Sequence, residues 1–157
     1  MNTSQLYDTD YEAWLLEQIQ SLQRGNLEAL DIPHLIEELE GLNKSNEREL
    51  ESYLIVLLTH LLKWEFQPAL RCGSWSGSIR YSRNRIAKLF KQQKSLRSRI
   101  NSFIPDAYQE ALEVASEETK IKIHLFPQSC PYSIEQLLDK NWLPQWDRRT
   151  PNPSNKL

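Results

Sequence analysis

Histidine and carboxylate side chains in the sequence HLIEELE could together hold a metal ion. His34 precedes Glu37 by three residues and Glu38 by four, so all three side chains can lie near one face of a helix. His60, in the later sequence THLLKWEFQP, could point from a neighbouring helix into the same space. Imidazole and carboxylate groups that converge between the helices of a bundle can bind a metal ion. Helical di-metal proteins repeat Glu-x-x-His on two helices, whereas the order here is reversed and occurs once, so the pattern favours a solvated acidic face without a metal or another cofactor.

Two polar residues, His60 and Lys63, interrupt the otherwise apolar sequence YLIVLLTHLLKW. A histidine near its ordinary pKa can act as a general base, but no Ser or Cys nucleophile stands at a recognisable spacing from His60. A buried polar group needs a hydrogen-bond partner, and we expect a carboxylate of the acidic helix, Glu37 or Glu38, to supply it. Lys63 can lay its aliphatic stem along apolar surface and keep its ammonium group in water. The sequence therefore favours a structural histidine and a non-enzymatic protein.

Charge is strongly segregated along the chain. Residues 1–65 carry a net charge of −9, whereas residues 66–105 contain no Asp or Glu and carry +9. The cations of this basic segment are Arg71, Arg80, Arg83, Arg85, Lys88, Lys91, Lys94, Arg97 and Arg99. Such a segment can bind a polyanion such as nucleic acid, with Trp75 and Tyr81 nearby for stacking. It can also pack beside the acidic helices of the same chain or of a second copy, and the nearly equal and opposite charges favour this second interpretation.

The composition is typical of a globular cytoplasmic protein. Of the 157 residues, 25% are charged and 39% are hydrophobic. No apolar run is long enough to cross a bilayer, and the N-terminal sequence lacks the basic start and apolar core of a signal peptide, so no membrane partner is expected. The two cysteines, Cys72 and Cys130, form no CxxC motif, which argues against a disulfide scaffold and fits a reducing compartment.

Helical periodicity runs through most of the chain and predicts an all-α bundle of about five to six helices with a short C-terminal helix. The predicted helices cover residues 9–25, 31–44, 46–66, 79–93, 95–105 and 105–120, and the short one begins near Ser133. Thr9 with Glu12 forms a capping-box pattern at the start of the first helix, Gly25 closes that helix as a C-cap, and Ser133 with Gln136 resembles a capping box. The sequence GSWSGS, residues 73–78, is predicted to be a loop or a helix start. Apolar stripes on the first two contain Trp14, Leu15, Ile19 and Leu22, and Leu35, Ile36, Leu39 and Leu42. The helix over 46–66 is apolar nearly all round in its second half, so we expect it at the centre of the bundle, with Leu54, Leu57, Leu58 and Leu61 buried.

We expect one α-helical domain over residues 1–147. The sequence IKIHLF, residues 121–126, is the one segment that alternates like a strand, and it is too isolated to build a sheet. The tail over residues 148–157 is rich in Pro, Asn and basic residues and is predicted to be disordered.

Five blocks of the sequence resemble a known bacterial family. The blocks are LYDTDYEAWLLEQ, HLIEELE, THLLKWEFQP, SWSGSI and FPQSCPYSIEQLL, and they span about Leu6 to Pro144 in this order. They are similar to the family called domain of unknown function 29, which is especially frequent in cyanobacteria. The resemblance implies a small, α-helical, cytoplasmic protein and implies no established activity.

Three hypotheses of function follow from these patterns. We favour a non-enzymatic protein-binding or regulatory module whose partner is another protein or a second copy of the chain. The alternative is a nucleic-acid-binding protein that uses the basic segment 71–99. A second alternative is a metal-binding or enzymatic bundle that uses His34, Glu37, Glu38 and His60.

Overall fold

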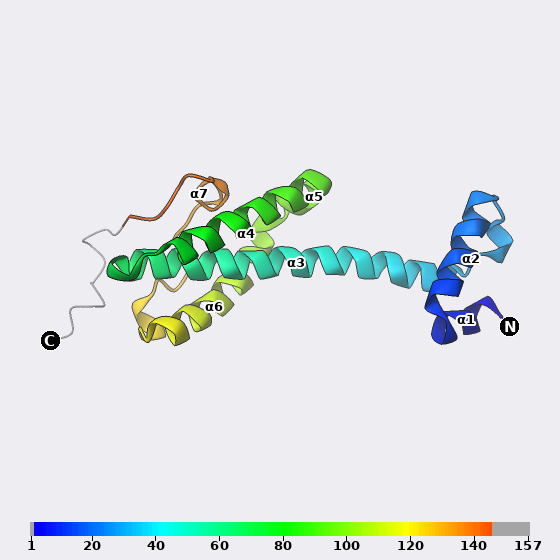
Figure 1. Cartoon of the computed structure of the whole chain (residues 1–157), viewed down its shortest axis with the longest axis horizontal. Coiled ribbons are helices and arrows are strands. Elements are labelled where there is room, and N and C mark those ends of the chain that lie inside the picture. The colour runs from blue at the N-terminus through cyan, green and yellow to red at the C-terminus, as the bar shows by residue number, and fades with distance from the viewer. Residues whose placement is uncertain (1, 146–157) are drawn as a thin grey trace. The chain divides into compact units, whose positions relative to one another are not determined.

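The computed structural model describes residues 2–145, and over this range every regular element is helical (Figure 1). The α-helices are α1 (Thr3–Thr9), α2 (Tyr11–Gln23), α3 (Ile32–Phe66), α4 (Gly73–Gln92), α5 (Lys94–Ser98), α6 (Ile100–Thr119) and α7 (Ile134–Leu138). Three short 3-10 turns connect them: η1 (Leu27–Ala29), η2 (Pro68–Leu70) and η3 (Ile123–Leu125). The predicted all-α bundle is confirmed, and the sequence IKIHLF forms no strand.

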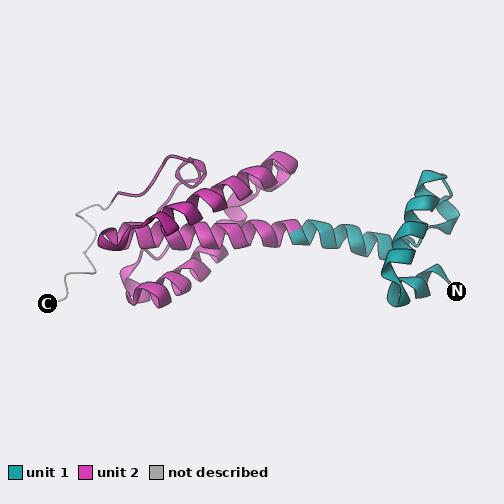
Figure 2. Cartoon of the chain, viewed as in Figure 1, with its two compact units in different colours: residues 1–45 teal, residues 46–157 magenta. Residues whose placement is uncertain are grey.

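The chain divides into two compact units, Met1–Ser45 and Asn46–Leu157 (Figure 2). Unit 1 contains α1, α2, η1 and the first part of α3, and unit 2 contains the second part of α3 and the elements that follow. The single domain over residues 1–147 stays a prediction. The tail predicted over residues 148–157 lies outside the described residues.

Helix α3 is one helix of 35 residues, so the prediction of separate helices at 31–44 and 46–66 is wrong. Gly41, Asn43 and Ser45 lie at the predicted break and have lower helix propensity than alanine or leucine. A glycine inside a helix costs only about 1 kcal/mol relative to alanine. No proline follows Pro33 until Pro68, so nothing in this range removes a backbone donor, and the helix continues.

The core of unit 2 forms around the second part of α3, with α4 and α6 on either side of it (Figure 1). Leu54, Leu57, Leu58 and Leu61 each have 0% exposure, which confirms the predicted central position of this segment. The same apolar cluster takes in Ile86 of α4 and further residues of α6 and the C-terminal segment. None of the helices in residues 2–145 combines the length and the apolar character needed to cross a membrane.

Two helices of unit 2 extend beyond their predicted limits. Helix α4 begins at Gly73 rather than at Ile79, so GSWSGS, for which a loop or a helix start was predicted, is the start of the helix. Trp75 in this first part of α4 lies over the ammonium group of Lys63, 4.8 Å from nitrogen to ring centre. Lys63 also donates to Glu118 of α6 at 2.6 Å. The contact with Lys63 connects Trp75 to α3 and so stabilises a segment whose own helix propensity is weak.

Helix α6 passes through Pro105, although we predicted that one helix ends and another begins there. The proline removes one backbone donor from the first turns of the helix. Beyond it, Ala107, Tyr108, Ala111 and Leu112 are all buried, and their packing outweighs the missing hydrogen bond. The predicted capping box of the last helix is confirmed, since Ser133 and Gln136 bond each other's backbone N–H groups.

Replacing Leu58 by alanine should lower the free energy of unfolding by about 2 to 5 kcal/mol, because the side chain is fully buried in the centre of unit 2. Chemical denaturation of both proteins measures this loss. Val56→Ala is the matched control, since Val56 lies on the same helix and is 38% exposed. Equal losses for the two variants would contradict the assignment of the core.

Candidate functional site

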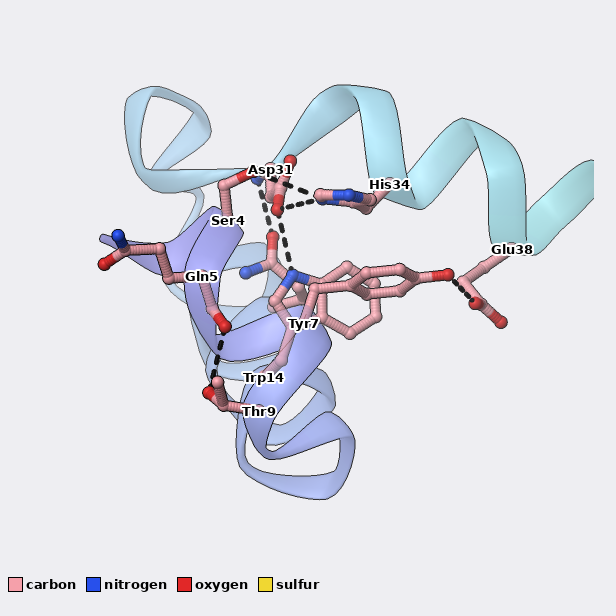
Figure 3. A network of polar contacts seen from close by, with 9 residues as sticks. Ser4, Gln5, Tyr7, Thr9, Trp14, Asp31, His34 and Glu38 are labelled. Atoms are coloured by element: carbon pink, nitrogen blue, oxygen red, sulfur yellow. Dashed lines mark hydrogen bonds and ion pairs between the residues drawn. The ribbon is translucent and has the colours of Figure 1, made fainter. Parts of the chain in front are cut away.

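The polar centre of unit 1 is the carboxylate of Asp31, which stands directly before α3 (Figure 3). Trp14 of α2 donates its indole N–H to Asp31 Oδ2 at 3.1 Å, and His34 Nδ1 lies 2.7 Å from the same oxygen. The backbone N–H of Asp31 donates to Gln18 Oε1 at 2.8 Å. Trp14, Gln18 and Asp31 are all buried. One carboxylate and its backbone therefore connect α2 to the start of α3.

Short-range features of the sequence set where α2 begins, which of its residues share a face, and where the chain turns back after it. Asp10 accepts a hydrogen bond from the backbone N–H of Ala13 and so caps the start of α2, one residue after the predicted cap at Thr9. Trp14 and Gln18 are four residues apart and lie on the same face of α2. Gly25 adopts a φ of +67° after α2, as expected for a helix-ending glycine, and lets the chain turn back.

Two tyrosines cover the imidazole and the next turn of α3. The ring of Tyr7 stacks on His34, with 3.9 Å between ring centres and an angle of 18°. Its hydroxyl donates to Glu38 Oε1 at 2.6 Å, and the hydroxyl of Tyr11 donates to Glu38 Oε2 at 2.8 Å. Glu38 is therefore an acceptor for two phenols, which fixes α1 and the start of α2 to α3.

These contacts lower the pKa values of the two carboxyl groups and raise the pKa values of their hydrogen-bond partners. The hydrogen bond to Asp31 raises the pKa of His34 above its ordinary value. Burial opposes ionisation of Asp31, but the hydrogen bonds from His34 and Trp14 outweigh it and the pKa of Asp31 is lowered. The hydrogen bond to Glu38 raises the pKa of Tyr7 to about 12, and the bonds from Tyr7 and Tyr11 lower the pKa of Glu38. Each shift favours the ionised carboxylate and its protonated partner.

A carboxylate that orients an imidazole is a known device for general base catalysis, so the geometry around His34 has to be tested for it. Ser4 Oγ is the hydroxyl near the ring, but it lies 3.5 Å from Nδ1, the nitrogen that faces Asp31. A general base would have to offer its other nitrogen to a nucleophile. Among residues 2–145, no three His, Cys, Asp or Glu side chains lie close enough together to hold a metal ion. The arrangement is best suited to holding helices together.

The structure does not bring the four candidate metal ligands together. His34 and Glu38 take part in the network of unit 1, and Glu37 is exposed. His60 belongs to unit 2, where its Nδ1 lies 2.7 Å from the carbonyl oxygen of Val56 in its own helix. The expected hydrogen bond from His60 to the carboxylate of Glu37 or Glu38 is therefore a wrong prediction, because α3 is one continuous helix that carries all three residues and gives His60 a partner four residues back.

Four of the nine candidate cations of the basic segment make specific contacts within unit 2. Arg83 is 2% exposed and donates to the carbonyl oxygens of Gln136, Leu137 and Trp142 at 2.7 to 3.0 Å. Arg71 donates to the carbonyl oxygen of Trp64 at 2.7 Å. Arg83 thus secures the C-terminal segment to α4 and is not available to a polyanion.

The other two of these four cations, Arg85 and Arg99, form ion pairs with glutamates of α3. Arg85 lies 3.1 Å from Glu49 and also donates to the hydroxyl of Tyr53. Arg99 lies 2.9 Å from Glu47. Partial neutralisation of the basic segment by α3 thus occurs within unit 2. The remaining cations are exposed, and no carboxylate in the described part of the chain lies within ion-pair distance of them: Arg80, Lys88, Lys91, Lys94 and Arg97.

A large exposed apolar surface on unit 1 is the feature that the sequence did not reveal. Of the 22 buried hydrophobic residues in the described chain, Trp14 alone belongs to unit 1. Ten large hydrophobic residues of unit 1 are exposed: Tyr11, Leu15, Leu16, Ile19, Leu22, Leu27, Ile32, Ile36, Leu39 and Leu42. We call the last four, which all lie on α3, the α3 stripe. Their spacing was visible in the sequence, but their exposure was not.

A family model described as Domain of unknown function DUF29 matches residues 6–143. No curated protein and no solved structure shows a significant match to the chain.

The pKa of His34, followed through its ring proton resonances, should lie above the ordinary value of 6.5 in the wild type and fall in Asp31→Asn, because that variant removes the charge that favours the imidazolium. Since the folded-state pKa is raised, the interaction stabilises the protein fully below pH 6.5, and this stabilisation is lost as the pH rises through the folded-state value. His34→Gln should therefore reduce stability more at pH 5.5 than at pH 8.5. Two outcomes would contradict this role of the pair. One is that His34→Gln lowers the stability equally at both pH values, and the other is that its effect depends on pH just as strongly when Asp31 is already replaced by Asn.

Replacing Arg83 by methionine should reduce the free energy of unfolding by at least about 2 kcal/mol, because it leaves three buried or partly buried carbonyl oxygens without their charged donor. Arg80→Met makes the same change of charge at an exposed site of the same helix, and its effect should stay within about 0.5 kcal/mol. Chemical denaturation compares the two variants. Similar effects would show that the three hydrogen bonds do not secure the C-terminal segment.

Proposed function

The chain belongs to the family Domain of unknown function DUF29, and from this premise we propose that it is a non-enzymatic, regulatory protein-binding module whose binding surface is the apolar face of unit 1. The observation that carries the proposal is the unequal distribution of apolar side chains between the two units. Unit 2 places 21 hydrophobic residues in one buried cluster, whereas unit 1 buries Trp14 and exposes ten large hydrophobic residues.

The physical argument is that unit 1 is too small to bury its own apolar residues. A folded unit of about 40 residues rarely builds a sufficient core without a disulfide, a metal ion or a partner. Both cysteines, Cys72 and Cys130, lie in unit 2 and are free. Burial of apolar surface contributes about 25 cal/mol per Å², so a partner that covers several of the exposed leucines would gain much of its affinity from them.

The α3 stripe supports the same proposal by its spacing. Ile32, Ile36, Leu39 and Leu42 follow one another at intervals of four, three and three residues, and each is 49% to 66% exposed. This spacing places them on one face of the helix. Helices that bind partners through such a face use anchors at these intervals. Exposed apolar patches of this kind mark interaction sites in folded proteins.

Two further features belong to the proposal. The free cysteines support a cytoplasmic location, because an oxidising compartment favours disulfides. The exposed cations of α4 and α5 favour nucleic-acid binding as a second candidate function, with Tyr81, 58% exposed, available for stacking. The engagement of Arg71, Arg83, Arg85 and Arg99 within unit 2 reduces the charge available for that second function.

An affinity capture from native lysate, with the full chain as bait and with and without nuclease treatment, tests the proposal. The wild type should retain a protein partner in near-stoichiometric amount, and nuclease should not release it. The variant Ile36→Ser with Leu39→Ser should retain at least about tenfold less, because it removes two anchors from the centre of the α3 stripe.

Leu70→Ser with Ile123→Ser is the matched control, since both residues are exposed hydrophobics of unit 2. This control should capture as much partner as the wild type. Equal capture by the stripe variant would remove the basis of the proposal, and release by nuclease would favour nucleic acid as the partner.

A further inference from the structure

We propose that the partner of unit 1 is a second copy of the chain, and that the α3 stripe of each copy docks on the cationic face of α4 and α5 of the other. This inference rests on the proposed function and deepens it by naming the partner. We call the exposed residues Arg80, Lys88, Lys91, Lys94 and Arg97 the cationic face. The inference is carried by the charges that border the α3 stripe and by the exposed cations of unit 2.

Acidic residues border the α3 stripe. Glu37 and Glu40 are exposed and alternate along α3 with Ile36 and Leu39. Unit 1 as a whole contains nine Asp and Glu against two Lys and Arg, a net charge of −7. Two units of this charge would repel each other if their stripes met face to face. The surface that covers the stripe must therefore be cationic as well as partly apolar.

The cationic face of unit 2 has the required properties. Its five residues lie within a stretch of 40 residues, 66–105, that contains no Asp or Glu. None of them lies within ion-pair distance of a carboxylate anywhere in residues 2–145. The long aliphatic stems of Lys and Arg can cover leucine side chains while their charged ends reach the bordering carboxylates. Tyr81, which is 58% exposed beside Arg80, adds apolar area to the same helix.

The proposed dimer has twofold symmetry. Each copy offers one acidic apolar surface and one cationic surface, and the contact between them is made twice. A contact made in one direction alone would leave a free surface at each end and would build an open chain. The reciprocal dimer satisfies both surfaces of both copies.

Charge reversal on each surface tests the inference. The acidic-side variant carries Glu37→Lys with Glu40→Lys, and the cationic-side variant carries Lys88→Glu with Lys91→Glu. All four residues are exposed, and circular dichroism should show unchanged helicity. By analytical ultracentrifugation over a range of concentrations, the wild type should be a dimer, and each variant alone should dimerise about a hundredfold more weakly because like charges then face each other.

Mixing the two variants in equal amounts is the decisive measurement. The reversed acids of one variant then face the reversed cations of the other, and the unchanged surfaces also match, so a mixed dimer should form with near wild-type affinity. Lys120→Glu with Lys122→Glu is the control for net charge alone, since these exposed residues lie outside the cationic face, and it should remain dimeric.

Three outcomes would overturn the inference. A wild type that stays monomeric at all concentrations excludes a second copy, and if lysate capture still depends on the α3 stripe, the proposed function stands with a different protein as partner. A dimer that survives reversal of the cationic face would show that a surface other than the cationic face covers the α3 stripe. A mixture that fails to restore the dimer would show that the two surfaces do not meet.

Discussion

The distribution of apolar residues around α3 is the constraint on which the rest of the structure depends. From Leu50 onward the helix buries Leu50, Leu54, Leu57, Leu58, Leu61, Leu62 and Phe66, so other helices must pack on several of its sides. Before Leu50 the α3 stripe holds four large apolar residues of the helix, and all four are exposed. The core of unit 2 therefore collects around the second part of α3, and unit 1 has no comparable core. Helix α3 stays continuous because no proline interrupts it, and packing of its second part outweighs the weak propensity near Gly41.

Unit 1 compensates for its missing core with directed polar contacts. Asp31 collects the indole of Trp14 and the imidazole of His34, and Glu38 accepts from Tyr7 and Tyr11. Hydrogen bonds to charged groups are stronger than neutral ones and fix orientation as well as position, so a few of them can hold three helix segments. They bury little apolar surface, however, because the aromatic rings stand between the helices and the leucines lie outside them. The same arrangement that orders unit 1 thus leaves its large apolar side chains exposed.

Electrostatics divides the basic segment into a structural and a free part. Arg83 satisfies carbonyl oxygens of the C-terminal segment, and Arg85 and Arg99 pair with Glu49 and Glu47 of α3. The pairs are partly exposed, and exposed pairs contribute at most about 1 kcal/mol, so their main effect is to set which charges remain available. What remains is a group of exposed cations on α4 and α5, which gives these helices a positive charge at the surface of unit 2.

The sequence by itself determined the helical class, the central apolar segment at Leu54 to Leu61, the glycine turn at Gly25 and the capping box at Ser133, because each depends on periodicity or on residues a few positions apart. It also gave the spacing of the apolar residues in unit 1. It did not determine that α3 runs unbroken to Phe66, that α6 continues through Pro105, or that Arg83 is buried. Only the tertiary structure decided these features, together with the partners of Asp31 and the exposure of the α3 stripe, because each depends on contacts between residues far apart in the chain or on their absence. A stripe of leucines has the same spacing whether a neighbouring helix covers it or not, and only the packing of the whole chain distinguishes the two cases.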